Sequence, residues 1–211
     1  MPTCPLCADR SAKRFCPAKE GQICAVCCAT KREIEIDCPS DCTHLKAGRS
    51  YEAEKRTPDP ELAAKLHKFD NAFLREYSGV LDVVSRAVAS EYMDSQWLVD
   101  NDAIEVYKAM AATMKTLSGG IHYEYQPDGP VRQSLFRRVR ALLDELMQPQ
   151  EAPDRRALKV SEAVEVMEFL TFAAQINSNG RPRSRQYLHW LKSLATEAQA
   201  AEQPAGLILP S

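Results

Sequence analysis

The sequence predicts a mostly α-helical protein, in which a small cysteine-rich N-terminal domain with a short β-hairpin precedes an all-α bundle of about six helices. Two observations support this fold class. All eight cysteines lie between Cys4 and Cys42. From Pro60 onward, apolar residues recur at spacings of three and four, which is the periodicity of amphipathic helices. We therefore expect two parts of different character, a head and a body.

The head covers residues 1–49 and is poor in large apolar side chains. A segment of this size cannot bury enough apolar surface to fold alone, so a metal or disulfides must supply the difference. Within it, polar and apolar residues alternate from Arg32 to Asp37, and this pattern predicts one arm of the hairpin. Residues 50–59 form the expected linker, residues 60–199 the bundle and residues 200–211 a tail.

Helix boundaries in the body follow from capping residues and breakers. Asp59 is the expected N-cap of the first helix, with Pro60 at its first position. Asn101 or Asp102 is expected to cap the third helix, and Ser184 the sixth. The fifth, from about Arg155 to Ile176, is apolar on most sides, which predicts a central position. The six apolar stripes are Leu62 to Tyr77, Leu81 to Tyr92, Ile104 to Leu117, Val131 to Leu146, Val160 to Ala174 and Tyr187 to Leu194.

Clustered cysteines in a chain without a secretory signal point to metal rather than to disulfides. The spacing contains two C-x-x-C pairs, Cys4/Cys7 and Cys24/Cys27, and structural zinc takes four such ligands in a closed tetrahedron. Eight thiols therefore supply two zinc sites, with His44 able to replace a member of the second. An interleaved arrangement would place one ion on Cys4, Cys7, Cys24 and Cys27 and the other on Cys16, Cys28, Cys38 and Cys42. A redox dithiol, an iron–sulfur cluster and disulfides are the rival interpretations.

The segment 4–44 resembles the cross-brace zinc fingers, the group that contains the MYND and HIT fingers. The resemblance rests on Cys4-x2-Cys7, on the run from Ile23 to Cys28 and on Cys38-x3-Cys42 near a histidine. It departs from those families because His44 follows the last cysteine. The resemblance implies protein–protein contact rather than catalysis. The layout as a whole is similar to bacterial proteins that carry a cysteine-rich head on a helical body.

Charge bears on the choice of partner. The whole chain has a net charge of −2, and residues 1–50 carry eight Lys/Arg against six Asp/Glu. Two zinc ions, each with four thiolates, would bring the head to about −2. A finger that grips phosphate is expected to be clearly basic. We therefore expect the head to bind a protein partner.

Arginines of the body provide the alternative, a nucleic-acid-binding regulator. Arg181, Arg183 and Arg185 precede a predicted helix N-terminus, where amides favour an anion. Arg137 and Arg140 lie in a second basic segment, 132–140. For the loop, the competing interpretation is a solvated connection whose arginines pair with acids of neighbouring helices. For the segment 132–140, it is an ordinary exposed helix face.

The chain shows none of the common catalytic motifs, so we expect a non-enzymatic protein. The weakest alternative is an enzyme with a pocket at the ring-rich loop after Gly120, made of His122, Tyr123, Glu124 and Tyr125; simple packing of these rings explains them as well. No apolar run approaches the roughly 20 residues that span a bilayer. A cytoplasmic location without membrane contact is therefore expected.

Overall fold

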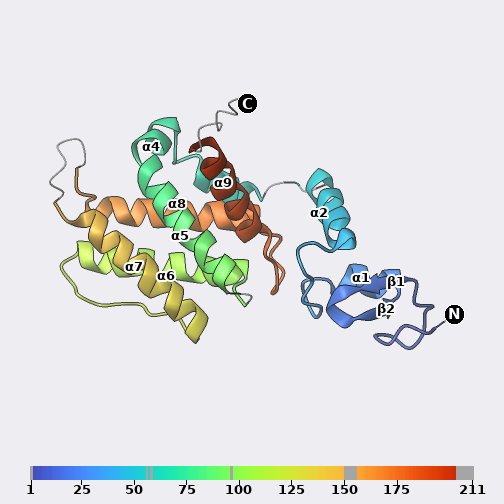
Figure 1. Ribbon diagram of the computed structural model, residues 1–211. Coiled ribbons are helices and arrows are strands. Elements are labelled where there is room, and N and C mark those ends of the chain that lie inside the picture. Colours follow the sequence, from blue (N-terminus) through green and yellow to red (C-terminus); the bar gives the residue numbers. More distant parts are fainter. Residues whose placement is uncertain (1, 56, 58, 96, 150–155, 203–211) are drawn as a thin grey trace, which may run out of the picture.

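The computed structural model describes residues 2–55, 57, 59–95, 97–149 and 156–202 (Figure 1). The predicted fold class is confirmed: a short antiparallel hairpin lies near the N-terminus, and the other regular elements of the described residues are helices. The tail beyond Glu202 and the expected start of the fifth body helix at Arg155 lie outside the described residues. No helix in the described ranges is both long and apolar enough to cross a membrane.

The hairpin lies earlier than the sequence predicts. Its strands are β1 (Arg14–Cys16) and β2 (Gly21–Ile23), joined through a short 3-10 helix, Pro17–Lys19, and paired with Arg14 opposite Ile23. The connection closes at Glu20, which adopts the left-handed conformation with φ 49°. Helix α1 (Ala25–Lys31) follows directly.

The prediction of a strand from Arg32 to Asp37 is wrong. The chain turns there, and the carbonyl of Lys31 accepts hydrogen bonds from the amides of Ile34, Glu35 and Ile36. The alternating pattern has another cause. Ile36 is 1% exposed in the head core, whereas Ile34 is 44% exposed to solvent. The apolar positions therefore do not share one buried face. We call Lys31–Asp37 the acidic turn.

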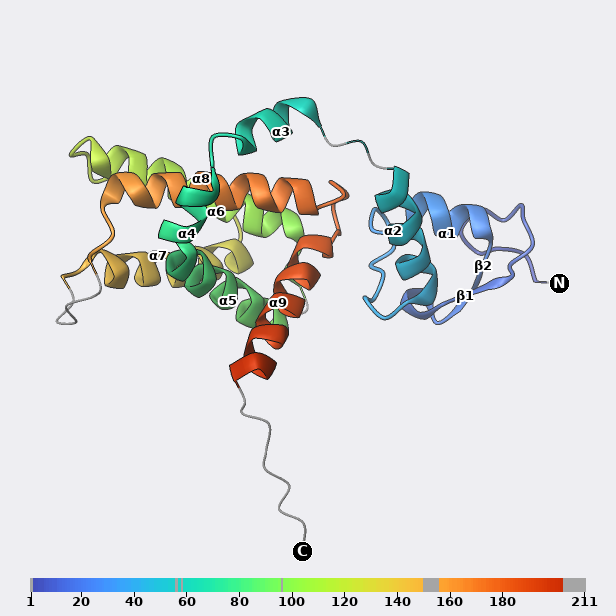
Figure 2. The same cartoon turned by 90° about the horizontal axis from the view of Figure 1, so that it is seen from above.

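Helix α2 (Thr43–Lys55) occupies most of the segment predicted as a linker. Figure 2 shows α2 between α1 and the helical body. Arg49 and Glu52 on this helix contact other parts of the chain, as described below. The segment is therefore a structural element of the head.

The body begins with Asp59, which accepts the amide of Glu61 as the predicted N-cap of α3 (Pro60–Leu66). The first predicted helix is interrupted at Asp70, because its side chain accepts the amide of Phe73 and starts α4 (Asn71–Glu76). The remaining helices are α5 (Ser78–Asp94), α6 (Asp100–Ser118), α7 (Pro130–Met147), α8 (Val160–Asn177) and α9 (Gln186–Glu202).

The body core forms around α8, which packs against α3, α5, α6 and α9, the central position that its sequence predicts. Buried side chains of α6, α7 and α8 meet there, among them Met110, Leu143 and Met167. One polar contact crosses this core: the hydroxyls of Tyr107 and Tyr187 lie 3.0 Å apart, and both residues are fully buried.

Candidate metal centre

Four cysteines of the head meet at one point. The sulfur atoms of Cys4, Cys7, Cys24 and Cys27 all lie within 4.8 Å of one another. This is the set predicted for the first ion. Three of the four residues are buried, and Cys7 is partly exposed.

Local backbone geometry explains how each C-x-x-C pair turns both sulfurs to the same side. After Cys7, Ala8 adopts φ 53°, and its amide donates to the carbonyl of Cys4, which closes the first turn. Cys24 is the N-cap of α1, and its Sγ accepts the amide of Cys27 at 3.3 Å. The N-terminus of a helix favours negative charge, so this position suits thiolates.

The same geometry changes the acidity of the thiols. Burial raises the pKa of Cys4, but hydrogen bonds from the amides of Cys24 and Leu6 outweigh burial and bring this pKa to about 6. Amides of Arg10 and Asp9 lower the pKa of Cys7. Burial and the neighbouring sulfurs raise the pKa of Cys27 to about 12. Four sulfurs this close cannot all carry charge alone, whereas a divalent cation among them removes the repulsion.

The dimensions fit one metal ion. With zinc–sulfur bonds of about 2.3 Å, the edge of a tetrahedron is about 3.8 Å. Cys7 Sγ and Cys24 Sγ lie 3.9 Å apart. All eight cysteines are free of disulfide bonds, so every sulfur is available as a ligand. Four thiolates would fill a tetrahedral ion, which leaves no position for a reacting water.

The other predicted ligands are less tightly gathered. Cys16 ends β1, Cys28 lies in α1, and Cys38 and Cys42 lie between the acidic turn and α2. Burial is the main cause that raises the pKa of Cys38, and the nearby charges of Cys42 and Cys16 raise this pKa further. His44 lies in the first turn of α2. Within the described residues, no three of these five side chains meet the spacing of the first four.

Two arginines of the predicted anion-binding loop bind carboxylates of the head. Arg181 lies 2.8 Å from a carboxylate oxygen of Glu52, and Arg185 forms an ion pair with Asp37. Arg183 has an exposed side chain, but its amide donates to the carbonyl of Glu33. The loop therefore binds anionic groups, and these belong to the same chain.

Most arginines of the segment 132–140 are also paired. Arg132 binds Asp102 at 2.7 Å, Arg138 binds Glu91 at 3.1 Å, and Arg140 binds Asp144 at 2.9 Å. Arg137 is exposed. Pairing reduces the positive charge that this face can offer to a phosphate backbone.

The ring-rich loop after α6 folds back on that helix, as its composition predicts. The amide of Tyr125 donates to Thr113, and the carbonyl of Tyr123 accepts from Thr116. The rings of Tyr123 and Tyr125 pack edge to face, with centroids 4.8 Å apart. His122, Tyr123, Glu124 and Tyr125 are all exposed, so they line the surface rather than an enclosed pocket.

Glu33 and Asp37 on the head and Asn179 on the body join the two parts, and none of the three is predicted as a site residue from the sequence. Arg49 pairs with Glu33 within the head. Glu33 is 1% exposed, and Asn179 donates to its carboxylate at 2.8 Å. The only available signal was the Asn-Gly pair at 179–180, which predicts a turn but not what the turn binds.

No family model, curated protein or solved structure matches this chain.

Proposed function

We propose that this chain is a non-enzymatic zinc protein whose head serves as a protein-interaction or assembly module. The observation that carries the proposal is the four-thiolate group of Cys4, Cys7, Cys24 and Cys27, whose sulfurs lie within 4.8 Å of one another. Soft thiolates at tetrahedral spacing select zinc over harder cations. A filled coordination shell favours a structural role.

A second zinc ion on Cys16, Cys28, Cys38 and Cys42 belongs to the same proposal. The sulfur ligands are the support: the charges of Cys42 and Cys16 contribute, after burial, to raising the pKa of Cys38, and Cys28 adjoins Cys27 on α1. His44, two residues after Cys42, can serve as an alternative ligand. Binding of the ion would draw these side chains together.

Surface chemistry of the head supports a protein partner. Within residues 2–49, three large apolar side chains are exposed: Phe15 at 61%, Val26 at 46% and Ile34 at 44%. Phe15 lies on β1, which ends at Cys16, and Val26 lies on α1, which contains Cys27 and Cys28. Ile34 lies in the acidic turn that follows α1. Such side chains occur in protein interfaces more often than on inert surfaces, and two closed zinc sites would leave the head without the positive charge that nucleic acid requires.

Metal analysis of the purified full chain tests the metal half of the proposal. We expect two zinc ions per chain, with only the second lost in Cys38→Ser and the first lost in Cys7→Ser, alone or together with the second. One ion that disappears in Cys7→Ser but persists in Cys38→Ser contradicts the second site. A chain purified with ample zinc that retains none contradicts the whole proposal.

Affinity capture tests the partner half. We expect the triple variant Phe15→Ser, Val26→Ser, Ile34→Ser to lose a partner that the unaltered chain captures, with its zinc content unchanged. Trp97→Ser is the matched control, because Trp97 is 75% exposed on the body. If the triple variant still captures the partner and Trp97→Ser does not, the binding site lies on the body and the proposal for the head is contradicted.

A further inference from the structure

Polar contacts join the head to the body along a seam. On the head side lie the acidic turn and α2, and on the body side lies the segment Ser178–Arg185, which we call the arginine loop. The carboxylates of Glu33, Asp37 and Glu52 face Arg181 and Arg185 across this seam. Opposite charges on the two sides make the contact specific for one orientation.

Glu33 is the centre of the seam. Its carboxylate is almost fully buried and contacts Arg49 of α2, Asn179 at 2.8 Å and Arg181 at 3.7 Å. Its carbonyl accepts the amide of Arg183 at 2.9 Å. A buried carboxylate is tolerated only with such partners, and removal of one partner leaves an uncompensated charge. The seam therefore depends on the placement of one residue.

That placement is unusual for a glutamate. Glu33 adopts φ 55°, a left-handed conformation that a non-glycine residue takes only when its surroundings hold it there. The surroundings belong to the head core. Ile36 of the same turn belongs to one buried cluster with Cys16, Cys24 and Cys27. Helix α1, which leads into the turn, is capped by Cys24.

The head core has little else to stabilise it. Its buried members are four cysteines with Ala12, Ile23 and Ile36, and Leu45 of α2 is buried as well, whereas the body has a much larger core of its own. Without an ion among the sulfurs, so small a core cannot maintain the fold of the head. The acidic turn would then lose the shape that presents Glu33.

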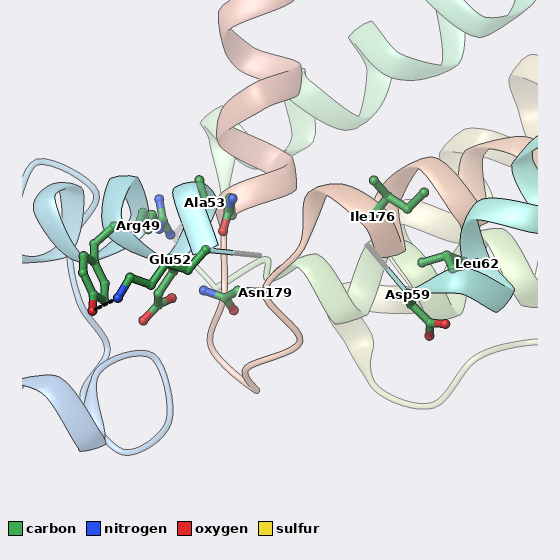
Figure 3. Close-up of a pocket in the computed structure, with 10 residues that line it drawn as sticks. Arg49, Glu52, Ala53, Asp59, Leu62, Ile176 and Asn179 are labelled. Carbon is green, nitrogen blue, oxygen red and sulfur yellow. Dashed lines mark hydrogen bonds between the residues drawn. The ribbon is translucent and has the colours of Figure 1, made fainter. Parts of the chain in front are cut away.

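The seam itself is suited to separation. A cavity of about 520 Å³ lies beside it, lined by Arg49 and Glu52 of α2 and by Asn179 of the arginine loop (Figure 3). Two guanidinium nitrogens at the seam, Arg49 Nε and Arg181 Nη1, are buried without a hydrogen bond in the described residues. Polar, incompletely packed contacts between parts of one chain open more readily than apolar ones.

We propose that metal at the four-cysteine group controls whether the head is docked on the body, so that metal loss separates the carboxylates of the head from the arginine loop. The inference rests on the metal site of the proposed function. With metal bound, Glu33 and Asp37 of the acidic turn stay in contact with the arginine loop. Without metal, Arg181 loses the buried partner Glu33, and Arg185 loses Asp37.

Hydrogen–deuterium exchange of the full chain tests the proposal, with zinc-loaded protein compared with protein stripped by a chelator under reducing conditions. We expect amides of 179–185, including the Arg183 amide that donates to Glu33, to exchange at least about tenfold faster after stripping. Amides of α6 and α8 serve as the reference and should keep their rates, because they belong to the separate body core.

Glu33→Gln separates the seam from the metal. It keeps the shape of the side chain and removes the charge, so we expect full zinc content together with faster exchange at 179–185. Glu35→Gln is the matched control, because Glu35 pairs with Lys31 on the exposed side of the same turn. It should leave both readouts unchanged.

Each outcome decides between the two proposals. If zinc binds but stripping leaves 179–185 protected, docking does not depend on metal and the inference is overturned, while the proposed function stands. Accelerated exchange throughout α6 and α8 also overturns it, since the body would then unfold with the head. If no metal binds, both proposals fail, and Glu33→Gln still reports whether the seam exists.

Discussion

Ser184 Oγ donates a 2.6 Å hydrogen bond to the carboxylate of Asp100, and both residues are buried. Asp100 is the first residue of α6, and Ser184 lies just before α9. The same carboxylate accepts the amides of Gln186 at 3.0 Å and Leu188 at 3.2 Å. One helix therefore supplies the N-terminal cap of another, and the cap ties α6 to α9.

Loss of this cap should weaken the body. We expect Asp100→Ala to lower the free energy of unfolding by about 2–4 kcal/mol, because it leaves buried donors without acceptors and removes a helix cap. Denaturant unfolding measures the change. The control is Asp82→Ala, which removes an exposed pair with Arg86 and should cost less than about 1 kcal/mol. Equal effects of the two variants would contradict the role of Asp100.

The hydroxyls of Tyr107 and Tyr187 should behave as a coupled pair. Replacement of either one by Phe leaves the other hydroxyl buried without its partner, and we expect a loss of about 1–2 kcal/mol. The double variant should be more stable than the sum of the single losses predicts. A double-mutant cycle measures this coupling, and strictly additive losses would show that the two groups act independently.

The same pair predicts a sensitivity to alkali. Burial raises the pKa of both tyrosines. In the unfolded chain they lose their protons near pH 10, whereas the folded chain still holds them, so stability is complete below about pH 10 and falls as the pH rises above it. The decline should reach about 2.7 kcal/mol per pH unit for two groups. Unfolding at several pH values should show a flatter decline in the double Phe variant.

Gly48 marks a close approach within the head. A Cβ at this position would lie 1.3 Å from Nη1 of Arg32. This nitrogen donates to the carbonyl of His44, and Nε of the same side chain donates to the carbonyl of Cys28. We expect Gly48→Ala to destabilise the head by about 1–3 kcal/mol, because Arg32 must leave these carbonyls. Chelator competition for the metal and thermal unfolding measure the effect.

Gly79 is the matched control for that substitution. It also lies in a helix, but nothing stands within 4 Å of its added Cβ. Gly79→Ala should therefore stabilise the chain by about 0.5–1 kcal/mol through helix propensity and unfolded-state entropy. A Gly48→Ala variant that gains stability in the same way would refute the steric argument.

The sequence could predict the features that depend on short-range pattern. Apolar periodicity predicts the body helices, the Asp-Pro pair at 59–60 predicts the cap of α3, and the spacing of the two C-x-x-C pairs predicts the group that gathers at Cys4. These depend on residues a few positions apart in the chain. They are therefore visible without knowledge of the tertiary structure.

Features that depend on distant partners could not be predicted. The local pattern places Glu33 at a polar, solvent-facing position of a strand. Its burial could not be predicted, because the residues that contact its carboxylate, Asn179 and Arg181, lie far along the chain. Asp70 interrupted a continuous apolar stripe, since a side-chain cap outweighed periodicity. The ligand set around Cys38 stays a prediction, because its members come from β1, α1 and the segment before α2 rather than from two C-x-x-C turns.

Neighbouring residues of the arginine loop serve opposite sides of the molecule. The amide of Arg183 donates to the head at Glu33, and the side chain of Ser184 donates to the body at Asp100. Surface loops normally accept changes of length with little penalty. Here one inserted residue between positions 183 and 184 would put one of the two contacts out of register. The loop length is therefore under the same constraint as a core element, and an insertion at this point should separate head from body although both could still fold.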